Sequence, residues 1–377
     1  MASLTTLVVT NDFPPRIGGI EGFVAAACEA LGGDVVVLTR READARATEA
    51  ADARLPYEVV RLPGPLLPTR SVARAASTIM RERGISRVLY GAAAPLGLLA
   101  PALRRAGAVA QLGLTHGHEV WWATLPGARG ALRRIVDGLD HVGVISGYTE
   151  GRIAARIPYA ARAKLVRIPP PVDLGRFRPV TITALAQPVV VAAGRLVAQK
   201  GVDRLLDVWP LVRAAVPGAE LRIVGEGPQE RRLAERTSHL CGVSMLGPVP
   251  YDEMPQILQT ARVFALPVRT RWAGLNPEGL GRAFLEAAAS GLPVVVGRSG
   301  GAPETVLDGL TGSVVDDKDP AALVSALVRW LGDPEGAAEA GEAGRRYVAT
   351  HFGAASVGRL IRQCLDLETT ESQGLSQ

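Results

Sequence analysis

Residues 4–31, LTTLVVTNDFPPRIGGIEGFVAAACEAL, decide the fold class of this chain. Leu4–Thr10 is an apolar run of strand length, two prolines end it, and a helical stretch follows the Gly18-Gly19 turn. A strand, a glycine-rich turn and a helix in this order open an α/β domain. Because the same alternation continues along the chain, the sequence predicts parallel sheets with helices between their strands.

Thirteen apolar stretches are predicted to be strands. They are 4–10, 34–38, 57–61, 87–90, 109–114, 141–145 and 164–168, then 188–193, 220–224, 244–246, 263–266, 293–296 and 312–315. A chain of 377 residues is too long for one compact core and suits two domains that face a central cleft. We expect doubly wound Rossmann-like domains over 1–182 and 183–353, joined after a stiff Pro-Pro-Pro connector. A C-terminal helix over 354–368 is expected to pack back on the first domain.

Composition excludes several classes of protein. The chain is 47% apolar, yet no run approaches the ~20 apolar residues of a membrane span, and no basic signal region opens it. We therefore expect a cytoplasmic protein. Cys28, Cys241 and Cys364 lack the spacing of a disulfide framework or a zinc site, and we interpret them as buried free thiols.

Positive charge is concentrated in the first half of the chain. Residues 1–182 hold 23 of the 42 Arg and Lys residues and 15 of the 37 Asp and Glu residues, so they carry +8 and the rest −3. Between Arg61 and Leu112 eight arginines accompany one acid, Glu82. They are Arg61, Arg70, Arg74, Arg81, Arg83, Arg87, Arg104 and Arg105. Such a surface suits anionic lipid headgroups or nucleic acid, and a solvated arginine-rich face is the alternative. We predict a membrane surface and no nucleic acid.

Two turns that follow predicted strands suit phosphate. Gly18 and Gly19 precede a helix, where backbone amides and the positive end of the helix dipole favour an anion. This turn lacks the Gly-x-Gly-x-x-Gly pattern, which argues against a dehydrogenase. Arg195 and Lys200 follow the first strand of the second half, at the sheet edge where Rossmann-like domains bind ligands. Together they could clamp a departing diphosphate, although two surface cations are the alternative.

Two acids mark residues 276–290, NPEGLGRAFLEAAAS. We expect Asn276–Gly281 to open an apolar helix, so that the unpaired Glu278 and Glu286 stand roughly 12 Å apart along it. One carboxylate could then hold a sugar and the other a ribose, with Gly279 and Gly281 letting the helix N-terminus approach phosphates. A first-turn acid favoured by the helix dipole is an alternative for Glu278. It does not explain Glu286, a buried acid that needs hydroxyl partners.

Three further motifs are less specific. His116 and His118 follow a predicted strand and could meet a ligand, and a structural role is the alternative for His116. The sequence Asp317-Lys318-Asp319 has the Asp-x-Asp pattern of metal-dependent transferases without helper ligands, so we interpret it as a surface turn and predict no metal. Residues 225–228, GEGP, are interpreted as shaping the wall of a nucleoside pocket.

These residues together resemble the retaining glycosyltransferases of family 4. That family has the GT-B fold of two Rossmann-like domains, and its Glu-x7-Glu signature is matched by Glu278 and Glu286. The resemblance covers essentially the whole chain. Several stretches look most like the GDP-mannose-dependent phosphatidylinositol monomannoside α-(1-6)-mannosyltransferases of actinobacteria. They are NDFPPRIGGIE, YGAAAPLGLLAP, THGHEVWW, LRRIVDGLD, PVRTR, EGLGRAFLEA and GRSGGAPETV.

The resemblance implies a role for each candidate residue. Arg195 and Lys200 clamp the diphosphate, which Gly18 and Gly19 also contact. Glu278 and His118 hold the transferred sugar, Glu286 holds the ribose, and the turn at Val249 lines the guanine. The implied donor-binding residues are Gly18, Gly19, Arg195, Lys200, Val249, Glu278, Gly279, Gly281 and Glu286, and the catalytic ones are Arg195, Lys200, Glu278 and His118. The resemblance also implies that the departing diphosphate takes the acceptor proton. Neither a metal nor another cofactor is expected.

The chain departs from the family pattern at three places. Pro171 stands where a glycine is usual, 272–277 (WAGLNP) replace glycines followed by an acid and Val, and Arg282 replaces an aliphatic residue. We interpret Arg282 as a surface change.

The function expected from the resemblance is transfer of mannose from GDP-mannose to a phosphatidylinositol mannoside. The enzyme would act as a peripheral protein at the inner membrane face. One alternative is a transferase of the same fold that uses another nucleotide sugar on a soluble acceptor. The other is a non-catalytic or dehydrogenase-like nucleotide-binding protein.

Overall fold

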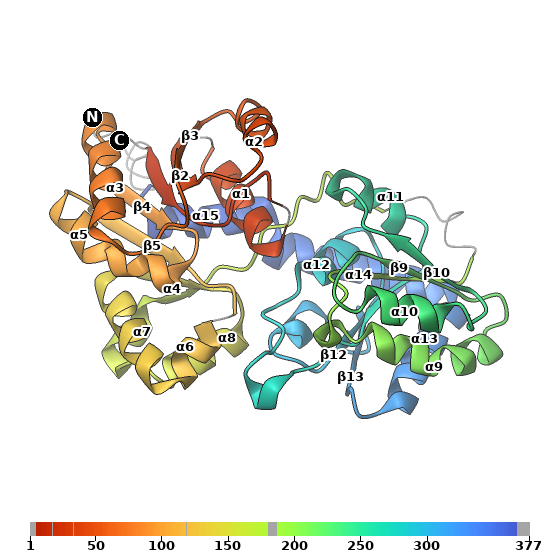
Figure 1. The fold of residues 1–377 in the computed structure, drawn as a ribbon. Coiled ribbons are helices and arrows are strands. Elements are labelled where there is room, and N and C mark those ends of the chain that lie inside the picture. Colours follow the sequence, from red (N-terminus) through yellow and green to blue (C-terminus); the bar gives the residue numbers. More distant parts are fainter. Residues whose placement is uncertain (1–4, 17, 33, 118, 180–186, 368–377) are drawn as a thin grey trace, which may run out of the picture. The chain divides into compact units, whose positions relative to one another are not determined.

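The chain forms two compact units, each built on a parallel sheet (Figure 1). The computed structural model describes all residues except 1–4, 17, 33, 118, 180–186 and 368–377. Unit 1 comprises residues 1–171 and 354–377, and unit 2 comprises residues 172–353. Each of the predicted strands overlaps an observed one, so the doubly wound α/β prediction is confirmed.

Unit 1 holds a sheet of seven strands in the order β3-β2-β1-β4-β5-β6-β7. The strands are β1 (Thr6–Val9), β2 (Val35–Arg40), β3 (Glu58–Leu62), β4 (Arg87–Tyr90), β5 (Ala110–Leu114), β6 (His141–Val144) and β7 (Leu165–Arg167). The helices are α1 (Gly19–Ala30), α2 (Ala45–Asp52), α3 (Arg70–Arg83), α4 (Ala93–Leu96), α5 (Ala100–Arg105), α6 (Glu119–Thr124), α7 (Pro126–Gly138), α8 (Gly147–Ala154) and α15 (Ala354–Cys364). Because every strand pairs in parallel, helices or other crossovers must connect the strands over the faces of the sheet.

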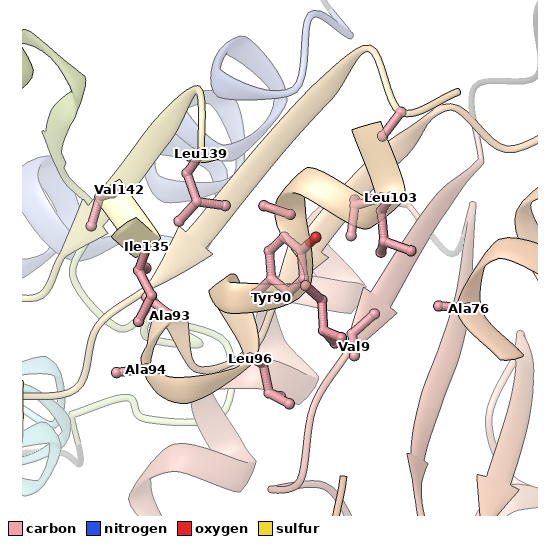
Figure 2. Packing of buried hydrophobic residues seen from close by; sticks show 14 of the residues in the cluster. Val9, Ala76, Tyr90, Ala93, Ala94, Leu96, Leu103, Ile135, Leu139 and Val142 are labelled. Carbon is pink, nitrogen blue, oxygen red and sulfur yellow. The ribbon is translucent and has the colours of Figure 1, made fainter. Parts of the chain in front are cut away.

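Both faces of this sheet are buried. Successive strand residues point to opposite faces, and Val9 accordingly belongs to one apolar core while its neighbour Val8 belongs to the other. Figure 2 shows the first core, where the Tyr90 ring lies among aliphatic side chains. The buried Tyr90 hydroxyl donates to Oε1 of Gln111 at 2.7 Å, so its polar atom is satisfied.

The C-terminal helix α15 belongs to unit 1 and packs against α1. The Arg362 guanidinium on α15 donates to the carbonyl oxygen of Ala30 at the end of α1. From β4, Nε of Arg87 donates to the carbonyl oxygen of Leu365 at 2.8 Å. A segment that follows unit 2 in the sequence thus completes unit 1.

The two units divide after Pro171, earlier than the expected boundary after residue 182. The Val172 amide donates to the carbonyl oxygen of Phe352 at 2.8 Å, and Arg345 donates to the carbonyl oxygens of Leu174 and Phe177. These bonds attach the segment after Pro171 to unit 2. The expected boundary itself falls among residues 180–186, outside the described residues.

Unit 2 holds six parallel strands in the order β10-β9-β8-β11-β12-β13. They are β8 (Val189–Ala193), β9 (Glu220–Val224), β10 (Val243–Gly247), β11 (Val263–Leu266), β12 (Val294–Gly297) and β13 (Gly312–Val315). The helices are α9 (Val202–Ala215), α10 (Glu230–Thr237), α11 (Met254–Leu258), α12 (Arg282–Ala289), α13 (Pro320–Gly332) and α14 (Pro334–Phe352). Numbered within the unit, the order is 3-2-1-4-5-6, the order of dinucleotide-binding Rossmann domains.

Among the helices that the structure describes, none combines the length and the apolar character of a membrane span.

Candidate functional site

The candidate site lies at the carboxyl edge of the second sheet, where the strand order reverses. β8 lies between β9 and β11 in the sheet. The chain continues from β8 to β9 on one side and from β11 to β12 on the other, so the strand order reverses between β8 and β11. Doubly wound domains bind ligands beyond the carboxyl ends of the strands at this reversal. The loops that follow β8, β11 and β12 contribute Lys200, Glu278 and Ser299, respectively.

The loop after β8 holds both predicted cations. It ends in a short 3-10 helix, η4 (Ala198–Lys200), and Gly201 connects this to α9 with φ 73°. A Cβ atom at Gly201 would overlap with the carbonyl oxygen of Pro267, so this position requires glycine both for its φ and for the close approach. The Arg195 side chain is exposed and makes no hydrogen bond or ion pair with the described residues. It is therefore available to an anion.

Lys200 and Glu278 meet although they lie on different loops. Nζ of Lys200 donates to Oε2 of Glu278 at 2.8 Å, and Glu278 is only 8% exposed. The backbone of Glu278 is held by the loop after β12, because its amide donates to Oγ of Ser299 at 3.2 Å and its oxygen accepts from the Gly301 amide at 2.9 Å. Nε2 of Gln199 also donates to the carbonyl oxygen of Pro277 at 2.8 Å, which connects the loop that carries Lys200 to the loop that carries Glu278.

The predicted helix opening at Asn276–Gly281 is wrong. α12 begins at Arg282, and Gly281 precedes it with φ 97°. A side chain at Gly281 would overlap with the Phe284 ring. The backbone at Glu278 is bonded to the loop after β12 instead of to a helical turn, so the helical separation of roughly 12 Å does not describe the two acids. Gly279 lies next to Glu278 in the loop after β11 and is partly exposed.

Glu286 lies on α12 and is not the unpaired acid that the sequence suggested. Its Oε1 atom accepts from the Tyr251 hydroxyl at 2.8 Å and lies 2.7 Å from Nε of Arg282. Arg282 therefore is not a surface change: its side chain is 19% exposed and pairs one turn away with an acid that is 10% exposed. Burial raises the pKa of Glu286 above its usual range, and this effect outweighs the opposing effects of Arg282, Tyr251 and Arg176.

Tyr251 connects several charged groups around Glu286. It belongs to a short 3-10 helix, η5 (Tyr251–Glu253), and the guanidinium carbons of Arg176 and Arg282 each lie 4.9 Å from its ring centroid. Burial raises the pKa of its hydroxyl, so Tyr251 stays a neutral donor. Sequence reasoning missed this residue, although it lies two positions after Val249, the half-buried residue predicted to line a base.

Residues 225–228 support the loop that carries Arg195. The Leu196 amide donates to the carbonyl oxygen of Glu226 at 2.8 Å, and a Cβ atom at Gly225 would overlap with the carbonyl oxygen of Gly194. The two loops therefore pack backbone against backbone. The predicted contact of residues 225–228 with a nucleoside stays a prediction.

The remaining site predictions fall in unit 1. Gly18 precedes α1, and a Cβ atom there would overlap with the carboxylate of Glu21, while Gly19 has open space around its Cα. His118 lies outside the described residues. Nε2 of His116 bonds the carbonyl oxygen of Gly91 at 2.5 Å, as expected of a structural histidine. Contacts of Gly18, Gly19 and His118 with a ligand stay predictions.

Two of the weaker sequence interpretations are decided by the structure. Asp319 accepts from the Ala322 amide at 2.9 Å as the N-cap of α13, which fits a surface turn. Cys28 and Cys364 are buried, but Cys241 is exposed, so the interpretation of three buried thiols is wrong for Cys241. The described residues contain no group of three or more potential metal ligands. The prediction that no metal is needed stays a prediction.

The arginine-rich segment is less available to partners than the sequence suggested. Five of its eight arginines have partners within unit 1, and one of them, the exposed Arg81, donates only long hydrogen bonds to Ser77 and Thr78 on its own helix. The contacts of the other four are Arg61 to Asp52 at 2.7 Å, Arg83 to Glu58 at 2.8 Å, Arg87 to the oxygen of Leu365 at 2.8 Å and Arg104 to Asp140 at 2.5 Å. The arginines of this segment that stay exposed without an acidic or tertiary partner among the described residues are Arg70, Arg74, Arg81 and Arg105.

Comparisons with known proteins fit this geometry. Residues 17–176 match the protein-family model described as Glycosyltransferase Family 4, and residues 187–333 match the model described as Glycosyl transferases group 1. A relative from Mycolicibacterium smegmatis is 44% identical over 92% of this chain and 94% of its own. The chain belongs to glycosyltransferase family 4. The resemblance inferred from the sequence is confirmed.

The names of such relatives are informative about the subgroup of this glycosyltransferase. The Mycolicibacterium protein is named GDP-mannose-dependent α-(1-6)-phosphatidylinositol monomannoside mannosyltransferase. A Corynebacterium glutamicum protein, the corresponding transferase named for the monoacylated acceptor, is 41% identical over 97% of this chain and 99% of its own.

Solved structures agree with the GT-B fold of this glycosyltransferase. Sucrose-phosphate synthase from Thermosynechococcus elongatus superposes with a TM-score of 0.77 at 22% identity, covering 95% of this chain and 98% of that one. HepE from Anabaena, in complex with UDP, gives 0.76 at 18% identity, covering 96% and 99%. At these identities the likeness concerns the fold alone.

Proposed function

We propose that this glycosyltransferase transfers mannose from GDP-mannose to a phosphatidylinositol monomannoside, with retention of anomeric configuration and without a metal. The observation that carries the proposal is the Lys200–Glu278 pair at the reversal of strand order, with the exposed Arg195 on the same loop as Lys200. Cations suit a diphosphate and a carboxylate suits sugar hydroxyls. The donor and acceptor are those in the names of the relatives from Mycolicibacterium and Corynebacterium.

Binding of the donor changes the partner of Lys200. In the structure its ammonium neutralises Glu278, and both groups are largely shielded from water. A diphosphate that arrives between Arg195 and Lys200 supplies a stronger anionic partner for the ammonium. Glu278 is then free to accept hydrogen bonds from the hydroxyls of the transferred mannose.

Charge neutralisation is the main catalytic contribution of this site. As the glycosidic bond to the phosphate breaks, negative charge grows on the departing diphosphate, where Arg195 and Lys200 stabilise it. The diphosphate takes the proton of the acceptor hydroxyl on the face from which it leaves, which accounts for retention. Glu286 holds the ribose, Val249 lines the guanine, and the backbones at Gly279 and Gly281 lie near the phosphates.

The acceptor is a lipid, so we also propose peripheral association with the inner membrane face. The exposed Arg70, Arg74 and Arg81 on α3 supply positive charge, and Trp121 on α6 is 48% exposed. Basic residues are attracted to anionic headgroups, and tryptophan favours the membrane interface. Co-sedimentation with anionic liposomes, lost at high salt, tests this part.

Transfer assays test the chemistry. The protein is incubated with radiolabelled GDP-mannose, UDP-glucose or UDP-N-acetylglucosamine, and with vesicles that contain phosphatidylinositol monomannoside or with a soluble mannoside. Label from GDP-mannose alone is expected in a dimannosylated lipid, also in the presence of a chelator. Transfer from a UDP-sugar to the soluble acceptor would favour the alternative enzyme, and no transfer from any donor would contradict the proposal.

A further inference from the structure

Arg282 carries a positive charge at a position that disfavours cations. It is the first residue of α12, and the N-terminus of a helix carries the positive end of the dipole, which disfavours a cation. It is also poorly exposed, with 19% of its side chain accessible. What offsets both costs is Glu286, one turn further along the same face.

The side-chain contacts of the Glu286 carboxylate with the described residues involve one of its two oxygens, Oε1. Oε1 receives the Tyr251 hydroxyl at 2.8 Å and faces Nε of Arg282 at 2.7 Å. The Arg282 guanidinium also donates to the Tyr251 hydroxyl, so the three side chains hold one another in place. No described residue forms a hydrogen bond with Oε2, the other oxygen of the same carboxylate. Oε1 is therefore committed, and Oε2 is the oxygen that remains for a ligand.

We infer that Arg282 is a positioning residue that limits Glu286 to a single strong hydrogen bond with the ribose of the donor. The inference rests on the proposed function, because it assumes that Glu286 meets a nucleoside. A carboxylate with both oxygens free can take the two vicinal hydroxyls of a ribose, one on each oxygen. With Oε1 committed to Arg282 and Tyr251, only one ribose hydroxyl is bound strongly. Removing that hydroxyl should therefore lower the affinity for the nucleotide much more than removing the other ribose hydroxyl.

Calorimetric titration with GDP, 2′-deoxy-GDP and 3′-deoxy-GDP tests the inference on the full chain. For the wild type, one deoxy analogue is expected to bind about tenfold or more weakly than GDP, as for loss of a hydrogen bond to a charged group, and the other within about threefold. Arg282→Leu removes the ion pair and leaves Oε1 with the Tyr251 hydroxyl alone, so Oε1 can accept the second ribose hydroxyl as well, and both analogues should then lose comparable affinity. Arg282→Lys keeps a cation that can reach Oε1 and should retain the wild-type asymmetry.

Controls separate positioning from a merely structural role. Tyr251→Phe removes the other partner of Oε1 and should also reduce the asymmetry, which keeps the test available if Arg282→Leu does not fold. Arg204→Leu removes an exposed arginine of α9 that pairs with Asp207, and should leave all three affinities unchanged. Equal losses for both analogues in the wild type, or an asymmetry that persists in Arg282→Leu, would overturn the inference alone. If the wild type binds neither GDP nor its two deoxy analogues, both the inference and the proposed function are overturned.

Discussion

Replacing Lys200 with Met leaves the carboxylate of Glu278 without its cation. The lost bond is 2.8 Å long, and the two side chains are 21% and 11% exposed. Removing one partner of a fully buried ion pair costs about 3–5 kcal/mol, and a net hydrogen bond to a charged group is worth about 1.5–3 kcal/mol. Because this pair is partly exposed, we expect a loss of about 2 kcal/mol, equivalent to roughly 4–8 °C in Tm for a unit of this size.

The double variant Lys200→Met/Glu278→Gln separates stability from function. Removing the charge on Glu278 removes the penalty of an unpaired buried acid, so calorimetry should show the double variant to be more stable than Lys200→Met. Mannose transfer should not recover with it, because the cation that stabilises the diphosphate is still missing, and the loss is about 100-fold or more. A double variant whose Tm is as low as that of Lys200→Met or lower, or mannose transfer by Lys200→Met at the wild-type rate, would refute this reasoning.

Four further predictions concern other parts of the chain. Arg61→Met should lower the free energy of unfolding in urea titrations by about 3 kcal/mol, because the side chain of Arg61 is only 8% exposed and pairs with Asp52, and it should leave liposome binding unchanged. Its counterpart Arg74→Gln changes an exposed arginine, so it should weaken liposome binding and leave stability unchanged. Trp272→Gly should not lower the urea midpoint, because Trp272 has φ 52° and is 71% exposed; a marked drop would contradict this. Only the exposed Cys241 should react quickly with a thiol reagent in the native state. Burial raises the pKa of Cys28 from 9.0 to about 12, so its contribution to stability is present below pH 9 and is lost as the pH rises towards 12, which alkaline Tm measurements check.

The sequence predicted the fold well because strands and turns are local signals. Short apolar runs of three to seven residues identify the strands, many of them next to Gly or Pro, and the parallel order follows from the helices between them. The start of α12 was missed for the same reason. Apolar periodicity extends across Gly281, whereas the actual start depends on that glycine's φ of 97° and on bonds from Glu278 to a loop after β12.

The candidate site was predictable in its charged residues but not in their partners. Lys200 was expected at the carboxyl edge of the sheet and Glu278 at the opening of a helix that faces the ligand, and no local pattern indicates that the two side chains pair. The Arg282–Glu286 pair could have been predicted, because its spacing of four residues is a helical neighbour relation. The contact of Tyr251 with Glu286 joins residues 35 positions apart through the tertiary fold, and no local pattern indicates it.

The affinity difference between GDP and GMP tests the central claim most directly, because the two ligands differ only in the phosphate that Arg195 and Lys200 are proposed to bind. Calorimetric titration of the wild type should show GDP binding about tenfold or more tightly than GMP, as expected for loss of charge-assisted contacts. In Arg195→Ala this difference should largely disappear while GMP affinity is kept. Equal affinities for the two ligands in the wild type, or an undiminished difference in Arg195→Ala, would contradict the account.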